Sequence, residues 1–366
     1  MNNDLPYQIA LTLVPHIGDV HAKALINIYG NAQAVFKAKK KELDHLEGIG
    51  TVRAKSIKDF TDFSSAEAEI KFIEKYKIIP LFITDENYPK RLLNCYDSPA
   101  LLYYRGNADL NCSKIIAVVG TRNNSDYGKQ VCEKFIEDLK SENVLVVSGL
   151  AFGIDTIAHK AALKNNLQTV AVLAHGLDRI YPQQNKPLAK QITEAGGLLT
   201  EFISNTNPDK QNFPRRNRIV AGLCDAVVVM ESSKKGGSLI TAELGNSYNK
   251  DVFAIPGRVN DGKSEGCNYL IKNNKAGLID SADDLLTMMN WKPQPKPTVK
   301  KQRELFIELS ADEKIVVNIL QQQESIQIDE LYFKSGLSSS AVATALLLLE
   351  MQNIVISLPG KVYKLA

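Results

Sequence analysis

The sequence lacks the cysteine spacing that marks a disulfide framework or a zinc site. Its five cysteines are scattered over 366 residues, odd in number and without a CxxC pair. It also lacks a long apolar run and an apolar N-terminal segment, so neither membrane insertion nor secretion is expected. These absences favour a reduced, cytoplasmic protein.

An excess of charge of one sign is also missing. Lys and Arg total 44 and Asp and Glu total 41, which gives a net charge of only +3. A nucleic-acid function would therefore have to rest on a local basic patch rather than on bulk charge. Hydrophobic residues make up 44% of the chain, which is enough to build the cores of two or three domains.

One local basic patch is present, Phe-Pro-Arg-Arg-Asn-Arg at residues 213–218, directly before an apolar run that starts at Ile219. Guanidinium groups fit phosphate oxygens bidentately and stack on bases. Phe213 offers a platform for an unstacked base. The alternative is a basic, solvated start of a helix, and the patch alone does not separate the two interpretations.

From residue 115 onward, short apolar runs alternate with helical stretches such as 128–141 and 155–164. Continuous β-branched runs are typical of strands that are buried on both faces. Alternation of strands and helices predicts an α/β fold with a Rossmann-like, mostly parallel sheet. The predicted strands are 115–119, 144–147, 169–173, 226–230 and 252–255. A turn-rich connector, residues 88–106, precedes them.

The N-terminal segment is predicted to be helical, with tight glycine turns at Ile17-Gly18 and at Gly48-Ile49-Gly50. The second turn is followed by Arg53, Lys55 and Lys58, where N–H groups at a helix start can meet a phosphate. The pattern is similar to tandem helix-hairpin-helix units of SAM-like type. A small packed helical domain with glycine turns is the alternative.

The C-terminal part begins with a segment rich in proline and lysine, which predicts a stiff, solvated linker. Predicted helices at 311–322, 328–335 and 341–352 and a hairpin over 353–365 follow in the order of a winged helix. The third of these helices carries no Lys or Arg, although helices that read base edges present Arg, Asn or Gln. A protein-contact or structural role is therefore favoured over DNA binding.

Four loops follow predicted strands at their carboxyl ends, where open α/β sheets place ligands. Backbone N–H groups and helix dipoles at such turns attract anions. A mononucleotide site needs only one or two such loops, so four of them predict a row of phosphate sites. The loops are Gly120-Thr121-Arg122, Ser148 to Asp155, Lys210 to Arg218, and Lys234 to Thr241.

Signatures of catalysis and of bound cofactors are weak. No P-loop spacing follows Gly120 and no GxGxxG follows a strand, so no nucleotide cofactor is expected. Asp155 and His159 stand one helical turn apart and could seat a metal, but a capping Asp beside a packed His is favoured. Glu243 is a carboxylate at a helix start, where balancing nearby charge is as good an explanation as catalysis.

At these residues the chain resembles the DNA-processing protein A family (DprA, also called Smf). The motifs that carry the resemblance run through the whole predicted Rossmann-like portion. They are Tyr88-Pro89, residues 102–106, 119–122, 148–156 with Ala158-His159, 176–178, Tyr181-Pro182, Glu201, 213–223, 237–242, 252–257 and 266–271.

The resemblance implies a non-enzymatic protein that binds single-stranded DNA as a homodimer formed through the Rossmann-like core. It also implies protection of incoming single strands and help in loading a RecA-type recombinase during natural transformation or DNA recombination. Phe152 stands where the family often has Arg, which removes one phosphate contact. Carried over by position and joined to the basic patch, the candidate DNA-binding residues are Gly120, Arg122, Ser148, Gly149, Lys210, Phe213, Arg215, Arg216, Asn217, Arg218, Gly237, Ser238 and Lys250.

The expected organisation has four parts. They are a helix-hairpin-helix-like module in 1–70, a Rossmann-like DNA-binding core in 71–290, a linker in 291–305 and a winged-helix-like domain in 306–366.

A rival hypothesis is a Rossmann-like phosphoribohydrolase that acts on nucleoside monophosphates. The loop Gly236 to Glu243 has a cadence similar to the Gly-Gly-x-Gly-Thr-x-x-Glu loop of those enzymes, and Arg218 would supply their arginine. The third glycine of that loop is replaced by Leu239, and the spacing of Thr241 to Glu243 differs.

Overall fold

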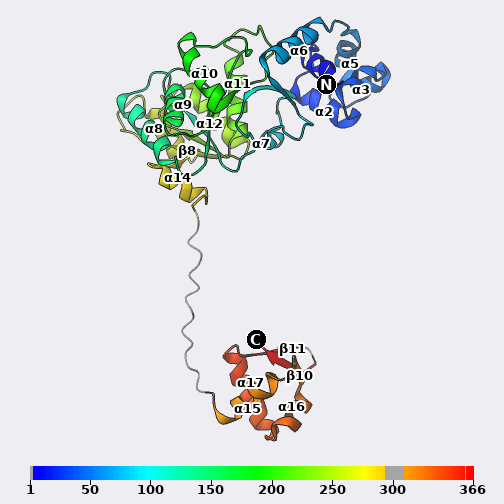
Figure 1. Ribbon diagram of the computed structural model, residues 1–366, viewed down its shortest axis with the longest axis vertical. Coiled ribbons are helices and arrows are strands. Elements are labelled where there is room, and N and C mark those ends of the chain that lie inside the picture. The colour runs from blue at the N-terminus through cyan, green and yellow to red at the C-terminus, as the bar shows by residue number, and fades with distance from the viewer. Residues whose placement is uncertain (1–2, 293–308, 359) are drawn as a thin grey trace. The chain divides into compact units, whose positions relative to one another are not determined.

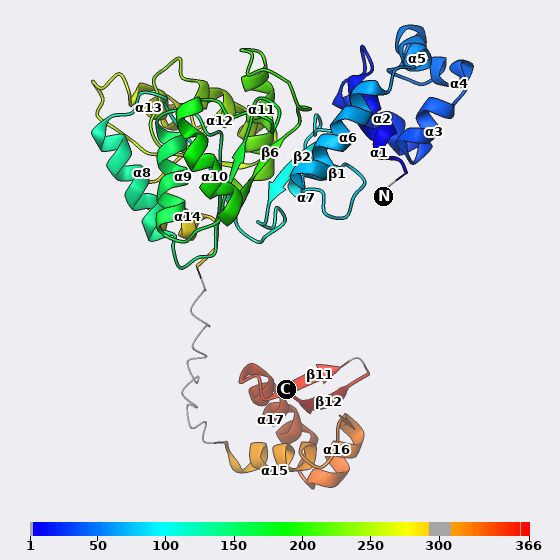
Figure 2. The ribbon, with the colours of Figure 1, turned by 45° about the horizontal axis from the view of Figure 1, so that its top comes forward.

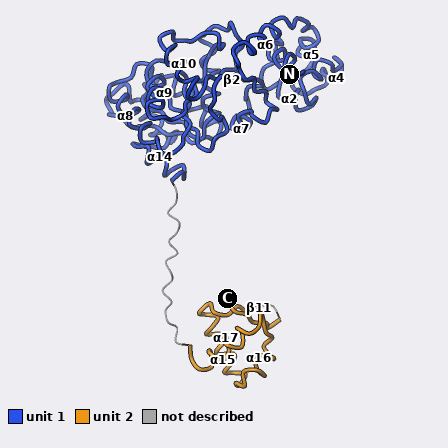
Figure 3. The backbone as a smooth tube through the Cα atoms, in the orientation of Figure 1, with its two compact units in different colours: residues 1–292 blue, residues 293–366 orange. Residues whose placement is uncertain are grey.

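The computed structural model describes residues 3–292, 309–358 and 360–366. The chain divides into two compact units, Met1–Lys292 and Pro293–Ala366 (Figure 3). Apart from Trp291 and Lys292, the expected linker lies outside the described residues.

The first unit begins with a helical module, as the sequence predicts. Gly48 and Gly50 have positive φ angles of +79° and +61°, so the second turn does require glycine, whereas Gly18 has an ordinary φ of −96°. The helices are α1 (Leu5–Leu13), α2 (Asp19–Tyr29), α3 (Ala32–Lys37), α4 (Lys40–Asp44), α5 (Gly50–Asp59) and α6 (Ser64–Tyr76). The last of them extends past residue 70, the expected end of the module.

The centre of the first unit is a nine-stranded sheet in the order β1-β2-β6-β5-β4-β3-β7-β8-β9. All five predicted strands are present, with ends within one residue of the prediction. They are β3 (Ile115–Val119), β4 (Leu145–Ser148), β5 (Thr169–Val172), β7 (Ala226–Val229) and β8 (Asp251–Ala254). Neighbours among them pair in parallel, as expected for a Rossmann-like core.

Four further strands were not predicted: β1 (Ile79–Phe82), β2 (Leu101–Gly106), β6 (Gly196–Thr200) and β9 (Gly277–Leu278). The segment expected to be a turn-rich connector contains a short helix, α7 (Lys90–Leu93), and the strand β2, which pairs antiparallel with β1 and β6. β6 begins with two glycines, which normally mark a turn. Here Gly197 leaves room for the ring of Tyr104, and Gly196 lies against the backbone of Thr169. The hydroxyl of Tyr104 donates to the carbonyl of Gly196 at 2.9 Å.

Helices cover both faces of the sheet (Figures 1 and 2). Side chains alternate along each strand, so one set packs under α8, α9 and α14 and the other under α11 and α12. These helices are α8 (Asp126–Asp138), α9 (Ile154–Lys164), α11 (Asn212–Leu223), α12 (Gly237–Ser247) and α14 (Ala282–Met288). The remaining elements are η1 (Gln183–Asn185), α10 (Lys186–Ala195) and α13 (Glu265–Lys272).

The second unit has the predicted winged-helix order, with one added short strand, β10. Ser338 caps the third helix by accepting from the amide of Ala341 at 3.3 Å. Pro359, part of the predicted hairpin turn, lies outside the described residues. The elements are α15 (Ala311–Leu320), β10 (Ile326–Gln327), α16 (Ile328–Ser335), α17 (Ser339–Met351), β11 (Val355–Leu358) and β12 (Val362–Leu365).

Within the described ranges, no single helix is long and apolar enough to cross a membrane. The bent pair α16 and α17 meets that length and composition only when its two helices are taken together.

Candidate nucleic-acid interface

The four loops expected to hold phosphates start at one edge of the sheet. β3, β4 and β7 are parallel neighbours, so the loops that follow them leave from a common edge. β6 is parallel to β5, so the segment that leads from β6 into α11 leaves from the same edge. The topology thus gathers the loops that the sequence predicts, at the carboxyl ends where such sheets bind ligands.

An aromatic and cationic cluster lies at this edge. The guanidinium of Arg122 stands 5.2 Å from the centre of the Phe213 ring, and the ring of Tyr181 meets Phe213 edge-on at 6.0 Å. Phe152 and Tyr181 are 44% and 48% exposed. The cluster surrounds a small hollow of about 30 Å³, lined by Arg122, Gly149, Ala151, Phe152, Tyr181, Pro182 and Phe213.

Phe152 and Tyr181 are site residues that the sequence analysis did not select. Phe152 was considered only as the loss of an arginine, and Tyr181 only as part of a family motif. Each belongs to a loop that leaves the carboxyl edge, after β4 and after β5. An exposed aromatic residue in such a loop is the signal that would have identified both.

Arg216, the second arginine of the basic patch, points into the protein and is only 4% exposed. Its Nη1 donates to the carbonyl of Val172 at 2.7 Å and to the carbonyl of Gly149, and its Nε donates to Oδ1 of Asn217 at 3.0 Å. Burial lowers the pKa of Arg216 to about 10, which the buried carboxylate of Asp155 opposes. Arg216 therefore ties α11 to the ends of β4 and β5.

The packing of Arg216 requires a glycine at position 149. A Cβ at Gly149 would overlap the guanidinium of Arg216. Gly237, another candidate site residue, has open space where its Cβ would lie.

Replacing Gly149 with alanine is expected to lower the free energy of unfolding by about 1–3 kcal/mol, because the guanidinium of Arg216 must move. Gly237→Ala serves as the matched control and should change the free energy of unfolding by about 0.5 kcal/mol or less. Urea unfolding measures both. Equal effects of the two substitutions would show that Arg216 does not impose the glycine at position 149.

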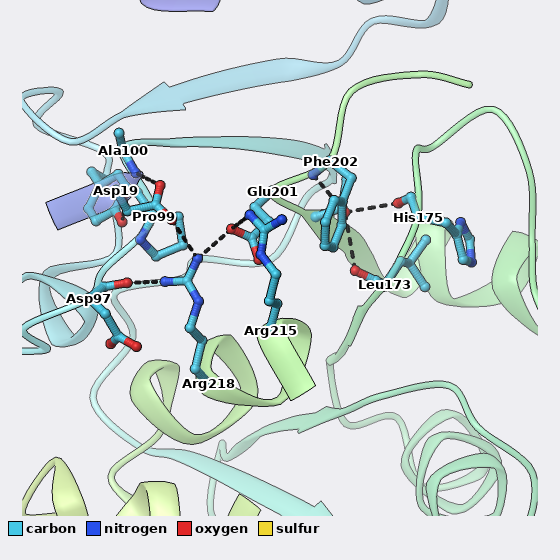
Figure 4. A network of polar contacts seen from close by, with 12 residues as sticks. Asp19, Asp97, Pro99, Ala100, Leu173, His175, Glu201, Phe202, Arg215 and Arg218 are labelled. Atoms are coloured by element: carbon cyan, nitrogen blue, oxygen red, sulfur yellow. Dashed lines mark hydrogen bonds and ion pairs between the residues drawn. The ribbon is translucent and has the colours of Figure 1, made fainter. Parts of the chain in front are cut away.

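Arg218, the third arginine of the patch, is also buried, at the junction of the core and the helical module (Figure 4). It pairs with Asp19 at 2.9 Å and with Glu201, and it donates to the carbonyl of Asp97. Burial lowers the pKa of Arg218, but the acidic neighbours outweigh burial and the net change is a rise. Arg218 therefore links α2 of the helical module to the core.

Arg215 is the one arginine of the patch whose side chain is largely exposed, at 55%. It lies over the ring of Phe202, with a guanidinium-to-centroid distance of 5.0 Å, and reaches Glu201 at 3.2 Å. The patch is thus divided between Arg215 at the surface and Arg216 and Arg218 in the interior.

The remaining candidate DNA-binding residues are also divided between the interior and the surface. Ser148 is fully buried and donates to the carbonyl of Val118 at 2.6 Å, and Ser238 donates to Oγ of Ser232 at 2.8 Å. Gly120 allows close packing, since a Cβ there would strike Ile154. Lys210 is exposed just before α11.

Lys250 lies away from the other candidates. It comes directly before β8, at the amino end of that strand and therefore at the opposite edge of the sheet. The structure does not bring Lys250 together with the loops at the carboxyl edge.

Comparison with known proteins identifies the family. A family model of DNA recombination-mediator protein A matches residues 80–290. The chain belongs to this family. The flanking parts also match known models, a helix-hairpin-helix motif over 9–70 and a DprA winged helix domain over 300–361.

Individual members of the DNA recombination-mediator protein A family are similar over most of their length. The DNA processing protein DprA of Streptococcus pneumoniae strain R6 is 43% identical over 62% of this chain and 85% of its own. The X-ray structure of DprA from Streptococcus pneumoniae superposes with a TM-score of 0.67, at 37% identity, and covers 77% of this chain and 97% of that one. A structure of DNA processing protein A from Helicobacter pylori, described for its single-stranded DNA binding mode, gives a TM-score of 0.54 at 31% identity. It covers 59% of this chain and 96% of that one.

In this family member, two basic side chains of the helical module, Arg53 and Lys58, hold parts of the module together. Arg53 donates to the carbonyls of His16 and Gly48 at 3.2 and 3.1 Å. Lys58 donates to the carbonyls of Phe36 and Ala38. Both side chains therefore already donate to backbone carbonyls, whereas Lys55 is exposed, and the contact of this turn with a phosphate stays a prediction.

The groups that suggested catalysis or metal binding have other partners. Glu243 pairs with Lys275 at 3.2 Å, while Arg218 pairs with Asp19 and Glu201, so the two residues of the hydrolase hypothesis are engaged separately. Asp155 accepts from the amide of Ala151 at 3.2 Å. Among the described residues, no group of three or more His, Cys, Asp or Glu side chains could hold a metal ion.

His159 is a packed core residue, as the favoured interpretation held. Its Nδ1 lies 2.7 Å from Oγ1 of Thr169, which itself donates to the carbonyl of Val146 at 2.8 Å. Oγ1 must therefore accept from Nδ1–H, which places a proton on Nδ1. Burial lowers the pKa of His159 to about 3.

This burial predicts a pH dependence of stability. Below pH ~6.5, His159 binds a proton in the unfolded state but not in the folded state. The free energy of unfolding therefore decreases as pH decreases, by up to ~1.4 kcal/mol per pH unit. His159→Gln should remove that part of the slope between about pH 6.5 and 5, measured by urea unfolding. Substitution of the exposed His45 by Gln is the control. A slope unchanged by His159→Gln would show that His159 is protonated in the folded protein.

Proposed function

We propose that this protein binds single-stranded DNA along the carboxyl edge of its core and acts as a recombination mediator. In this role it protects incoming single strands and helps to load a RecA-type recombinase in natural transformation or DNA recombination. The protein works without catalysis and as a homodimer formed through the core. A cytoplasmic location follows from these partners.

The observation that carries the proposal is the cluster of Arg122, Phe152 and Tyr181, which are exposed, around the half-buried ring of Phe213. Aromatic rings bind unstacked bases whatever their sequence, and an adjacent guanidinium can hold the phosphate between two bases. A duplex keeps its bases paired and stacked, so rings at the surface favour a single strand. The Helicobacter pylori relative, described for single-stranded DNA binding, supports the same ligand.

The exposure of each cationic side chain decides its proposed role. Arg122, Lys210 and Arg215 present exposed cations, and they are the residues proposed to contact phosphates. Arg216 and Arg218 support the site from within by fixing α11, so their proposed effect on DNA is indirect.

The proposal is tested by titrating the full chain with fluorescently labelled oligo-dT and with a duplex of the same length at two salt concentrations. Binding should be tighter for the single strand and should weaken as salt rises, because bound phosphates release counterions. Equal affinity for both forms, or affinity independent of salt, would contradict the proposal. Release of free base from nucleoside monophosphates would favour the hydrolase instead.

The recombinase part of the proposal needs its own test. Strand exchange by a RecA-type recombinase on DNA coated with single-strand binding protein should start sooner when this protein is present. No change in the lag would remove the loading role and leave the DNA binding intact.

A further inference from the structure

The carboxyl edge continues past Arg122, across β7 and β8, where another exposed aromatic residue lies. Tyr127 belongs to the first turn of α8 and is 50% exposed. Its hydroxyl donates to the carbonyl of Pro256, which follows β8, at 3.2 Å. The adjacent Gly128 packs against the carboxylate of Glu231, which follows β7. The ring of Tyr127 is therefore held at the ends of β7 and β8.

Exposed cations accompany this ring. Lys234 and Lys235 lie in the loop after β7, and Arg258 lies in the loop after β8. Within the described part of the chain, these three side chains form no ion pair and no hydrogen bond. They are positioned to meet an anion from solution.

The acidic residues of the same edge are partly engaged within the protein. Glu231 is buried and accepts from the amide of Ser125 at 2.8 Å. Asp261 accepts from the amide of Lys263 at 3.0 Å and from the hydroxyl of Ser264. The exposed acids are Asp126 and Glu265, in the first turns of α8 and α13.

We propose that Tyr127, Lys234, Lys235 and Arg258 form a second contact region for the same DNA strand, with Tyr127 stacking a base and the three cations holding phosphates. The inference rests on the proposed function and extends it. The bound strand then runs across the sheet from the Phe213 cluster toward β8, and the binding site is longer than the first region alone.

The order of strands sets the span of that path. Phe152 follows β4, Arg122 follows β3, the two lysines follow β7 and Arg258 follows β8, in the order of the sheet. Three steps of ~4.8 Å between strands give about 14 Å. A stacked strand at ~3.4 Å per nucleotide covers that distance with about four nucleotides. A short strand therefore fills the first region alone, and a longer one reaches both.

Strand length separates the two regions. We compare oligo-dT of about 3 and about 20 nucleotides. Three stacked nucleotides span about 10 Å, which is shorter than the path to β8, whereas the longer strand exceeds the usual site sizes of single-strand binders. Tyr127→Ala should weaken binding of the longer strand about 5- to 100-fold and leave the shorter strand nearly unchanged. Tyr127→Phe keeps the ring and loses only the bond to Pro256, so it should bind the longer strand like the unaltered protein.

The cations are tested with a charge-matched control. A triple substitution of Lys234, Lys235 and Arg258 by Ala should lower the salt slope for the longer strand by about 2, at ~0.7 per lost phosphate contact. The control replaces three exposed lysines by Ala: Lys160 and Lys164 of α9, and Lys140, which follows α8.

Three results would overturn the inference: no effect on the longer strand, the same effect on both strands, or an effect no larger than that of the control. The outcome is separable from the proposed function. If Phe213→Ala weakens both strands while the second-region variants do not, only the second region is refuted. If the unaltered protein binds neither strand, the proposed function fails.

Discussion

Replacing Arg218 with alanine is expected to lower the free energy of unfolding by about 3–5 kcal/mol. The side chain of Glu201 is 3% exposed and that of Arg218 is 9% exposed, so the substitution leaves a buried carboxylate without its main partner. Asp19 loses the same partner on the side of the helical module. The loss should therefore also loosen α2 from the core.

Urea unfolding at neutral pH measures this effect, with Arg215→Ala as the matched control. Arg215 contacts the same Glu201 but is 55% exposed, so its loss should cost about 1 kcal/mol or less. Burial raises the pKa of Glu201, which Arg218 opposes, so removing Arg218 should raise it further. The penalty should then shrink as pH falls toward ~4.3, the pKa of Glu in the unfolded chain, and it should vanish below that pH, where the carboxyl is neutral in both states. Equal effects of the two substitutions would contradict the division between buried and exposed arginines.

Replacing Phe213 with alanine is expected to weaken binding to oligo-dT by about 1–3 kcal/mol, the range for loss of one stacked base. The ring lies beside Arg122 and Tyr181, so its loss removes the platform on which we propose that a base stacks. Fluorescence titration well below the unfolding midpoint of each variant measures the effect.

Phe213→Trp supplies the control, because it keeps an aromatic face. It should bind about as tightly as the unaltered protein, since stacking tolerates different rings. If the alanine variant binds normally and the tryptophan variant does not, Phe213 acts through packing and not through a base.

The core strands were predictable because each is a continuous apolar run, such as Ile115–Val119, which is buried along its whole length. The edge strands were not. β2 lies in a segment with turn residues, and β6 opens with Gly196 and Gly197, so local sequence argued against both. Their pairing depends on contacts such as that of Tyr104 with Gly196, which join residues far apart in the chain.

The division of the basic patch could have been read from the sequence once the start of the helix was known. α11 begins at Asn212, so the patch is its first turns and not a loop before it. Arg216 then stands three, four and seven residues before Ile219, Val220 and Leu223, on the buried face. Without the first residue of α11, the sequence shows how many arginines the patch has but not which of their side chains point into the protein.

The glycines show a second limit of sequence reasoning. Gly120 and Gly149 were expected to lie in phosphate-binding loops, and the structure shows that a Cβ at these positions would overlap Ile154 and Arg216. A glycine after a strand indicates close approach of some group, and only the structure shows which group approaches.

The salt dependence of single-strand affinity, compared between the unaltered protein and Arg122→Ala, tests the central claim most directly. The claim is that exposed cations at the carboxyl edge hold phosphates while exposed rings hold bases. Arg122→Ala should lower the slope of log K against log salt by about 0.7, whereas Phe213→Ala should lower the affinity without changing the slope. A slope near zero for the unaltered protein, or one that Arg122→Ala leaves unchanged, would contradict the account.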